Sequence, residues 1–357
     1  MAAETKKIMI DNYRELSIMA GAIFRPVFLF SDRCQRQSGT GPGPCSIPAK
    51  LLAYITMIDI SDFIKSVEDK KKDIQKFYER GCRVLNMLLP CRFKARNKPV
   101  RDYTFATICK KNGLDMVAAS LYSLYRNSDY IPSRVVIISD GSWEPEFGVS
   151  YFCKRGLDVE CMMWQTCAEY YKESLPELHI WATRHIWGKK MAAILFLSEN
   201  NAVLFSDPDV LWYGTPLRED EWSSLPFKIS IDSMHSYDQD FIRQSGSGYL
   251  NDTPDPINCG VVYIKGGKSL LNEQAINCIR YQAEHCGNFA EQTVFAIMDL
   301  RFGNRWSREE VVSTVEDVIR PFFSRPVLFK NTIARHYLWR LKWIYWTEYF
   351  KMRITRV

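Results

Sequence analysis

The sequence lacks the signals of several protein classes. Its 357 residues contain no apolar run of the ~20 residues that a membrane-spanning helix needs, because Arg25 and Pro26 interrupt the most apolar early stretch, residues 18–30. We also find no pattern of a secretory signal peptide. The 11 cysteines are an odd number and form no Cys-x-x-Cys pair, which argues against a structural zinc site. Several lie in apolar runs, and this usage is typical of a reducing compartment. We therefore expect a cytoplasmic protein.

The chain also lacks the strong basic field of a dedicated nucleic-acid-binding domain. There are 47 Lys and Arg residues against 41 Asp and Glu, a net charge of +6. We therefore expect no nucleic-acid partner. A hydrophobic content of 46% and an aromatic content of 13% indicate a folded protein.

The organisation along the chain suggests three parts. Residues 1–100 form an accessory region, with a Gly/Pro-rich loop at 38–48 and a helical pattern over 61–89. Residues 101–336 alternate short apolar strands with amphipathic helices. Residues 337–357 form a basic, aromatic C-terminal helix.

The middle part has the pattern of an α/β sheet, parallel in its first half. In such sheets ligands bind beyond the carboxyl ends of the strands. We expect strands at residues 103–109, 134–139, 202–206 and 260–264, and helices at residues 113–125 and 188–197.

The most informative segment is an apolar strand that ends in two aspartates. In Asn201-Ala-Val-Leu-Phe-Ser-Asp207-Pro208-Asp209, a proline holds the turn between the two carboxylates. Two oxygen ligands at a strand end suit Mg²⁺ or Mn²⁺, which leave positions open for phosphate oxygens. Asp-Pro-Asp is also a common turn, so this segment alone leaves both interpretations open.

The motifs around this pair resemble those of nucleotide-sugar-dependent glycosyltransferases of the GT-A type, above all the glycogenin-like branch. The resemblance covers residues 103–336 and depends on the order and spacing of motifs that are individually modest. They are Tyr103-Thr-Phe-Ala-Thr107, Ser139-Asp140-Gly141, Trp187-Gly188-Lys189-Lys190, Asp207-x-Asp209, Ile257-Asn258-Cys259-Gly260-Val261-Val262-Tyr263 and Glu291-Gln292. The full His-x-x-Gly-x-x-Lys-Pro-Trp pattern of the glycogenin-like enzymes is missing.

The resemblance implies a Rossmann-like mixed sheet flanked by helices, a nucleotide-sugar donor and a bound Mn²⁺ or Mg²⁺. It also implies roles for individual residues. Thr104, Phe105 and Ala106 would border the nucleoside, Asp140 the base or ribose, and Lys189 the sugar–phosphate side. Asp207 would contact the metal or the donor ribose, Asp209 would be the firmer metal ligand, and His336 the third ligand.

The chemistry of glycosyl transfer agrees with these roles. A departing nucleoside diphosphate needs its charge neutralised, which a divalent cation does as a Lewis acid, with help from Lys189 or Arg335. The sugar carbon becomes oxocarbenium-like, and Glu291, with Gln292 beside it, is the candidate carboxylate near it. Glu291 can equally be a helix-start carboxylate. Asn258 and Gly260 would lie along the donor sugar and the acceptor cleft.

The sequence thus predicts transfer of a hexose from a nucleotide diphosphate sugar, with UDP favoured over GDP. The acceptor, whether a glycan, a lipid-linked sugar, a small molecule or a protein, is not identified. Three alternatives remain: a haloacid dehalogenase-type phosphatase with Asp207 as nucleophile, a sugar nucleotidyltransferase, and a non-catalytic carbohydrate-binding protein on the same fold.

The C-terminal segment allows two interpretations. Trp339, Trp343, Trp346, Phe350 and Ile354 recur at helical spacing among basic residues. Such a helix can lie on an anionic membrane surface, giving a peripheral membrane contact through 337–357. It can also pack on its own domain, which we favour, and in either case we expect it to be separate from the chemistry.

Overall fold

A computed structural model describes residues 79–81, 83–84, 86, 98–313, 330–338 and 342–354. All of them belong to one compact unit, Gln75–Arg320 with Pro326–Val357. The Gly/Pro loop at 38–48 and most of the helix expected over 61–89 lie outside the described residues.

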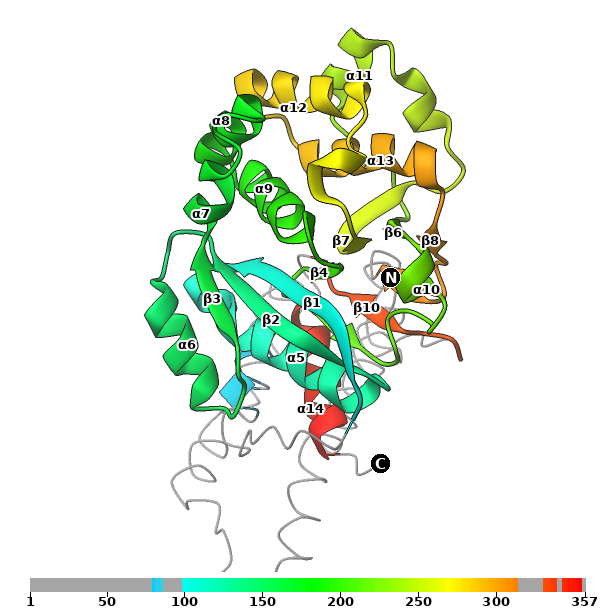
Figure 1. Cartoon of the computed structure of the whole chain (residues 1–357). Coiled ribbons are helices and arrows are strands. Elements are labelled where there is room, and N and C mark those ends of the chain that lie inside the picture. Colours follow the sequence, from blue (N-terminus) through cyan, green and yellow to red (C-terminus); the bar gives the residue numbers. More distant parts are fainter. Residues whose placement is uncertain are drawn as a thin grey trace, which may run out of the picture. The chain divides into compact units, whose positions relative to one another are not determined.

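The centre of this unit is a mixed seven-stranded sheet with the strand order β3-β2-β1-β4-β7-β6-β8 (Figure 1). In chain order the strands are β1 (Val100–Cys109), β2 (Ile131–Ser139), β3 (Glu160–Met163), β4 (Val203–Ser206), β6 (Phe227–Ile231), β7 (Ile257–Ile264) and β8 (Arg305–Trp306). The first four are mutually parallel, whereas β7 runs antiparallel to both β4 and β6. The predicted α/β class, parallel in its first half, is confirmed.

Helices cover both faces of this sheet. Strand side chains alternate between faces, so along β1 the residues Ala106 and Ile108 face one core while Tyr103 and Phe105 face the other. The first core lies under α7 (Trp164–Glu169), α8 (Pro176–Arg184), α9 (Ile186–Ser198), α11 (Gln239–Ser245), α12 (Glu273–His285) and α13 (Ala290–Phe302). The second lies under α5 (Leu114–Asn127), α6 (Pro145–Cys153) and α10 (Glu221–Ser224).

Helix α9 starts where α8 comes unusually close to it. A Cβ on Gly188 would lie 2.5 Å from the backbone carbon of Trp181 and 2.6 Å from the nitrogen of Ala182, so only glycine fits. The His185 side chain caps the helix by accepting a hydrogen bond from the Trp187 N–H. This contact fixes where the next two residues, both lysines, emerge.

A second, three-stranded sheet lies next to the main one. It consists of β5 (Val210–Trp212), β10 (Ala334–His336) and β9 (Val311–Ser313), with β10 in the middle. Helix α14 (Lys342–Ile354) packs its buried Tyr345, Trp346 and Tyr349 against Met116 and Ala119 of α5. The predicted packing of the C-terminal helix on its own domain agrees with this contact.

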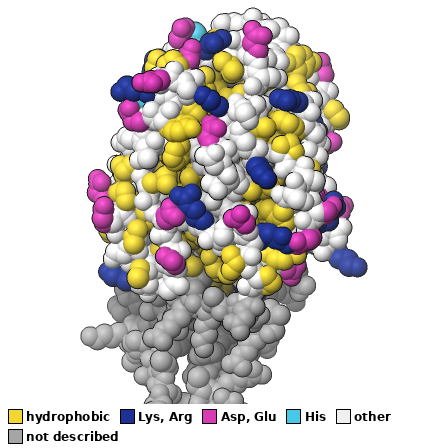
Figure 2. Space-filling model, in the orientation of Figure 1, with side chains coloured by type: hydrophobic (Ala, Val, Ile, Leu, Met, Phe, Trp, Pro, Cys, Tyr) yellow, Lys and Arg dark blue, Asp and Glu magenta, His cyan; other side chains and the backbone are white. Residues whose placement is uncertain are grey.

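The described surface mixes the two signs of charge. Figure 2 shows basic and acidic side chains interspersed with apolar ones over the face in view. Within the described residues, no helix is both long and apolar enough to cross a membrane.

Candidate active site

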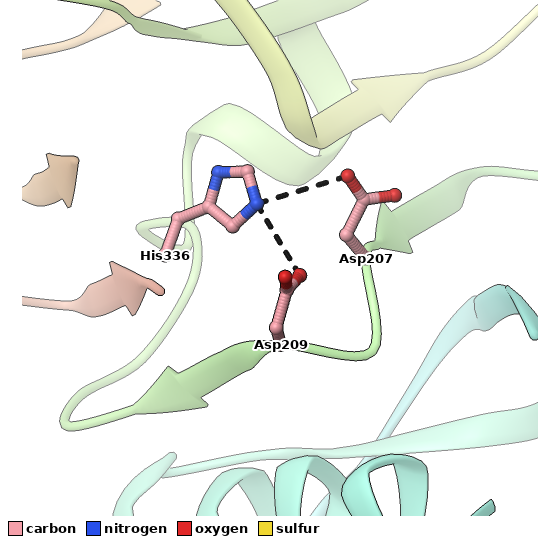
Figure 3. A group of neighbouring side chains, drawn as sticks. All are labelled: Asp207, Asp209 and His336. Carbon is pink, nitrogen blue, oxygen red and sulfur yellow. Dashed lines mark ion pairs between the residues drawn. The ribbon is translucent and has the colours of Figure 1, made fainter. Parts of the chain in front are cut away.

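Three possible metal ligands meet at the junction of the two sheets: Asp207, Asp209 and His336 (Figure 3). Their ligand atoms all lie within 4.8 Å of one another. The Nε2 atom of His336 lies 3.3 Å from Oδ1 of Asp209 and 3.8 Å from Oδ2 of Asp207. The two aspartate side chains remain 20% and 23% exposed, so solvent reaches the carboxylates from one side.

Strand pairing explains how residues more than a hundred positions apart come together. Asp207 directly follows β4, and Asp209 directly precedes β5. Strand β10 runs antiparallel to β5 with His336 opposite Val210, and the Tyr337 N–H donates to the Asp209 carbonyl at 2.9 Å. The ladder therefore places the imidazole beside the acidic turn.

The hydrogen bonds of Asn258 determine which nitrogen of His336 faces the aspartates. Asn258 Oδ1 accepts from the Gly260 N–H at 2.8 Å, and its Nδ2 donates to Asp232 Oδ2 at 3.0 Å, so the amide orientation is fixed. Oδ1 also lies 3.0 Å from His336 Nδ1, which must therefore carry the proton. Nε2 is thus the atom available for a metal, held by the kind of hydrogen bond that orients metal-bound histidines.

An irregularity in β7 brings Asn258 and Gly260 into this position. Ile229 of β6 pairs with Val262, but the next residue, Ser230, pairs with Asn258, so residues 259–261 have no partner in the ladder with β6, although Val261 still pairs with Ser206 of β4. A Cβ on Gly260 would lie 2.4 Å from both Cε1 and Nδ1 of the His336 ring. The imidazole therefore rests directly on this glycine. Bulges are enriched beside active sites because they re-aim side chains.

The charges in the triad perturb one another. Burial alone would raise the pKa of Asp209, but His336 and the ammonium of Lys342 lower it below its usual value. Burial alone would lower the pKa of His336, but Asp209 and then Asp207 raise it. The histidine thus lies in a field that attracts positive charge. Two carboxylates and an oriented imidazole are a donor set that fits a divalent cation.

A buried lysine connects the triad to a second group of polar side chains. Lys190 Nζ lies 2.8 Å and 3.1 Å from the two carboxylate oxygens of Asp207, 3.9 Å from Glu291 and 3.6 Å from Cys259 Sγ. Burial alone would lower the pKa of Lys190, but Asp207 and its other neighbours raise it above the usual value. The charged form of Lys190 is therefore favoured beside Asp207.

The predicted Glu291 and Gln292 lie in this second group, on the first turn of α13, and both are buried. Burial raises the pKa of Glu291 although Lys190 opposes the rise. Its Oε1 accepts from Cys259 Sγ at 3.4 Å, while Oε2 is buried without a hydrogen-bond partner. Gln292 donates to Asp232 Oδ2 at 3.4 Å. An unsatisfied buried carboxylate oxygen costs free energy, so this atom is suited to accept a hydrogen bond from a ligand.

Other predicted site residues lie elsewhere. Thr104, Phe105 and Ala106 are buried inside β1, paired with β2 on one side and β4 on the other, and their contact with a nucleoside stays a prediction. The carboxyl end of β1 is formed by residues 107–109. Asp140 follows β2 on the same edge, separated from the triad by β1.

The predicted Lys189 lies beside Asp140, at the end of β2. Lys189 Nζ donates to the Asp140 carbonyl at 2.8 Å and lies over the Trp164 ring, 4.4 Å from its centroid, so it is not part of the triad's surroundings. The lysine that contacts the triad is the next residue, Lys190, through Asp207. The suggested role of Arg335 in charge neutralisation is wrong. This side chain is fully buried and paired with Glu348 at 2.8 Å, on the other side of β10.

Sequence reasoning missed Lys190, Asp232, Cys259 and Lys342. A signal was present for two of them. Asp232 directly follows the buried strand β6, as Asp207 follows β4. Lys342 follows His336 by six residues, which is the histidine–lysine spacing of the glycogenin-like pattern quoted above. For Cys259, nothing in the sequence distinguished a site residue from a buried strand residue.

Similarity to known proteins is found only with solved structures, at low identity. No protein-family model matches the chain, and no curated protein matches it. The fold is similar to mouse xyloside xylosyltransferase 1, with 14% identity and a TM-score of 0.43 over 66% of this chain and 97% of that one. For the galactosyltransferase LgtC, in complex with donor and acceptor sugar analogues, the identity is 15% and the TM-score 0.45, over 71% of this chain and 97% of that one. For the bifunctional glycosyltransferase WbbM the identity is 14% and the TM-score 0.45, over 71% of this chain and 50% of that one.

These structures are glycosyltransferases, the class that the sequence motifs resemble. The identities and TM-scores are low, so we base the function proposed below on the side chains of this chain.

We predict that Gly260→Ala weakens binding of Mn²⁺ by about 10- to 100-fold, because the added methyl group displaces the His336 ring. Isothermal titration calorimetry with Mn²⁺ would measure this, at a temperature where circular dichroism shows both proteins folded. Gly248→Ala is the matched control, since a Cβ there meets no atom within 4 Å. Equal Mn²⁺ affinity in all three proteins would contradict the placement of His336.

We further predict that Lys190→Met destabilises the protein by about 3–5 kcal/mol, because Asp207 and Glu291 lose their buried counter-ion. Lys189→Met is the comparison, because it removes the ammonium of the neighbouring lysine. Its hydrogen bond to the Asp140 carbonyl is only partly buried, so the free energy of unfolding should fall by about 1 kcal/mol or less. Urea unfolding of both variants would test this contrast. Similar losses in the free energy of unfolding would show that Lys190 is not needed as the counter-ion of Asp207 and Glu291.

Proposed function

We propose that this protein is a metal-dependent glycosyltransferase that moves a hexose from a nucleotide diphosphate sugar, with UDP as the favoured nucleotide. The observation that carries the proposal is the junction of Asp207, Asp209 and an oriented His336 at the carboxyl edge of an α/β sheet. Residues 101–336 would form the transferase domain, with residues 1–100 as an accessory region and 337–357 as a C-terminal helix.

The triad would hold Mn²⁺ or Mg²⁺, with Asp209 and His336 Nε2 as ligands and Asp207 shared between the metal and Lys190. The imidazole among the ligands favours Mn²⁺ over Mg²⁺, because Mg²⁺ is typically bound by oxygen ligands alone. When bound, the cation supplies Lewis-acid stabilisation of the departing diphosphate. Lys342, whose field already reaches Asp209, is a second source of positive charge on this side.

The second group of side chains would bind the donor sugar. Glu291 Oε2 lacks a hydrogen-bond partner, and Asp232, Asn258 and Gln292 form one connected set of hydroxyl-binding groups beside it. Lys190 would lie between the two parts of the site, within 3.1 Å of both Asp207 oxygens and 3.9 Å from Glu291. Such an array binds a polyhydroxylated ring and stabilises positive charge at its reacting carbon. The nucleoside would lie at the carboxyl ends of β1 and β2, near Asp140 and Lys189.

The rival functions account for fewer of these contacts. A haloacid dehalogenase-type phosphatase needs Asp207 as a free nucleophile and a further acidic pair for its metal. Here both oxygens of Asp207 contact Lys190, and the third ligand candidate is an imidazole. A non-catalytic carbohydrate-binding protein has no need for a group of metal ligands beside a buried lysine and carboxyl group.

The direct test is a panel of nucleotide sugars with and without Mn²⁺. We expect a UDP-hexose with Mn²⁺ to raise the melting temperature most, because a ligand present at 100 times its Kd stabilises the folded state by about 2.7 kcal/mol. Slow Mn²⁺-dependent hydrolysis of the same donor should accompany the shift. No stabilisation and no hydrolysis with any donor would refute the proposal.

We predict that Asp209→Asn abolishes donor turnover while the protein stays folded, because the amide removes a charged ligand from a partly exposed position. Turnover is measured as release of nucleoside diphosphate in Mn²⁺, and folding by thermal denaturation. Asp252→Asn, an exposed substitution of the same kind, is the control. Activity that persists in Asp209→Asn, or in the wild type under chelation, would disprove the metal role.

A further inference from the structure

The C-terminal helix is more closely connected to the candidate metal site than its sequence suggests. Strand β10 has only three residues, and its side chains alternate between the two sides of the small sheet. His336 faces the aspartates, whereas the preceding Arg335 points to the other side and ends on α14. The strand that carries the third ligand candidate is therefore attached from behind to the helix.

The attachment is a buried charge pair surrounded by phenols. Arg335 NH1 donates to Glu348 Oε1 at 2.8 Å, and Glu348 Oε2 accepts from the hydroxyls of Tyr213 and Tyr337. Arg335 is 0% exposed and Glu348 6% exposed. A buried ion pair stays favourable only while both partners are present, so loss of the carboxylate would force Arg335 to move. Any such movement is transmitted along a three-residue strand to His336.

The same helix also reaches the acidic turn. The Tyr345 hydroxyl donates to the Met116 carbonyl at 2.7 Å and lies 3.4 Å from the Pro208 carbonyl, between the two aspartates. The Tyr337 N–H holds the Asp209 carbonyl at 2.9 Å. Helix α14 and its attached strand thus contact the backbone on which both acidic ligand candidates stand.

From these contacts we propose that α14 is a positioning element of the metal site, with Glu348 as its central positioning residue. The inference rests on the function proposed above, because it concerns the affinity of the Asp207–Asp209–His336 group for a divalent cation. It replaces the expectation that the C-terminal segment is separate from the chemistry. Glu348 touches none of the three ligand candidates and acts through Arg335, Tyr337 and the pairing of β10 with β5.

The test compares Glu348→Gln with Glu221→Gln. Glu221 is also a buried glutamate in a close ion pair, 2.6 Å from Lys228, and neither residue contacts the triad in the described structure. Both variants lose one buried carboxylate charge, so they control for general destabilisation. Tyr345→Phe is a milder third variant that removes only the hydroxyl near Pro208.

Two measurements are made on the full chain at a temperature where each variant is folded. We expect Glu348→Gln to weaken Mn²⁺ binding by 10-fold or more in calorimetric titration, Tyr345→Phe by a smaller factor, and Glu221→Gln by less than 2-fold. We expect amide hydrogen exchange in residues 334–337 to speed up in Glu348→Gln without metal, and to remain unchanged in Glu221→Gln.

Each outcome decides between the possibilities. Wild-type Mn²⁺ affinity and wild-type exchange in Glu348→Gln would overturn the positioning role while leaving the proposed function standing. Equal losses of Mn²⁺ affinity in Glu348→Gln and Glu221→Gln would show that Glu348 contributes only to general stability, and this would also overturn the positioning role. If the wild type binds no Mn²⁺, the proposed function fails. Exchange then decides alone, because it reports on the attachment of β10 without any metal.

Discussion

The arrangement of the candidate site depends on an excess of negative charge at buried and partly buried carboxylates. Asp207 and Asp209 are partly exposed, Asp232 and Glu291 are buried, and the buried Lys190 lies close to Asp207 and Glu291. Burying carboxylates without counter-charge is costly, so a fold can keep such a group only if the charge is neutralised. Two effects reduce this charge: burial raises the pKa of Glu291, and the neighbouring Asp209 and Asp207 raise the pKa of His336. A divalent cation between Asp207 and Asp209 would complete the balance, so the proposed metal ligands and the proposed sugar-binding group would form one site.

Lys190 also separates the two halves of this site. Both oxygens of Asp207 are within 3.1 Å of its ammonium, while Glu291 lies 3.9 Å away on the other side. Asp207 is therefore held in one orientation before any ligand arrives. Electrostatic stabilisation by fixed groups costs no reorganisation during reaction, which is how enzymes obtain much of their rate enhancement. The close packing at Gly188 belongs to the same constraint, since it sets the position from which Lys190 leaves α9.

The sequence allowed prediction of the features that depend on local pattern. The apolar runs located β1, β2 and β4 to within three residues at each end, because a buried parallel strand is apolar on both faces. The position of Asp207 and Asp209 at a carboxyl strand end followed from the same pattern. Features that depend on three-dimensional placement were not accessible. Lys189 and Lys190 are neighbours in sequence, and only the orientation of α9 on the sheet decides which one is buried. Thr104 to Ala106 were placed at a ligand although their strand continues to Cys109.

The bulge in β7 illustrates the same limit. Asn258-Cys259-Gly260 reads equally well as a turn or as a strand, and nothing local reveals that residues 259–261 interrupt the pairing with β6. Yet this departure allows Asn258 to bond His336 and gives Gly260 its contact with the ring. The third ligand candidate therefore needs support from two directions. Gly260 and Asn258 of β7 contact the imidazole itself, and the Arg335–Glu348 pair attaches β10 to α14 on the opposite side of the small sheet. A strand of three residues has too few ladder hydrogen bonds to fix a side chain alone, so these outside contacts determine where His336 stands.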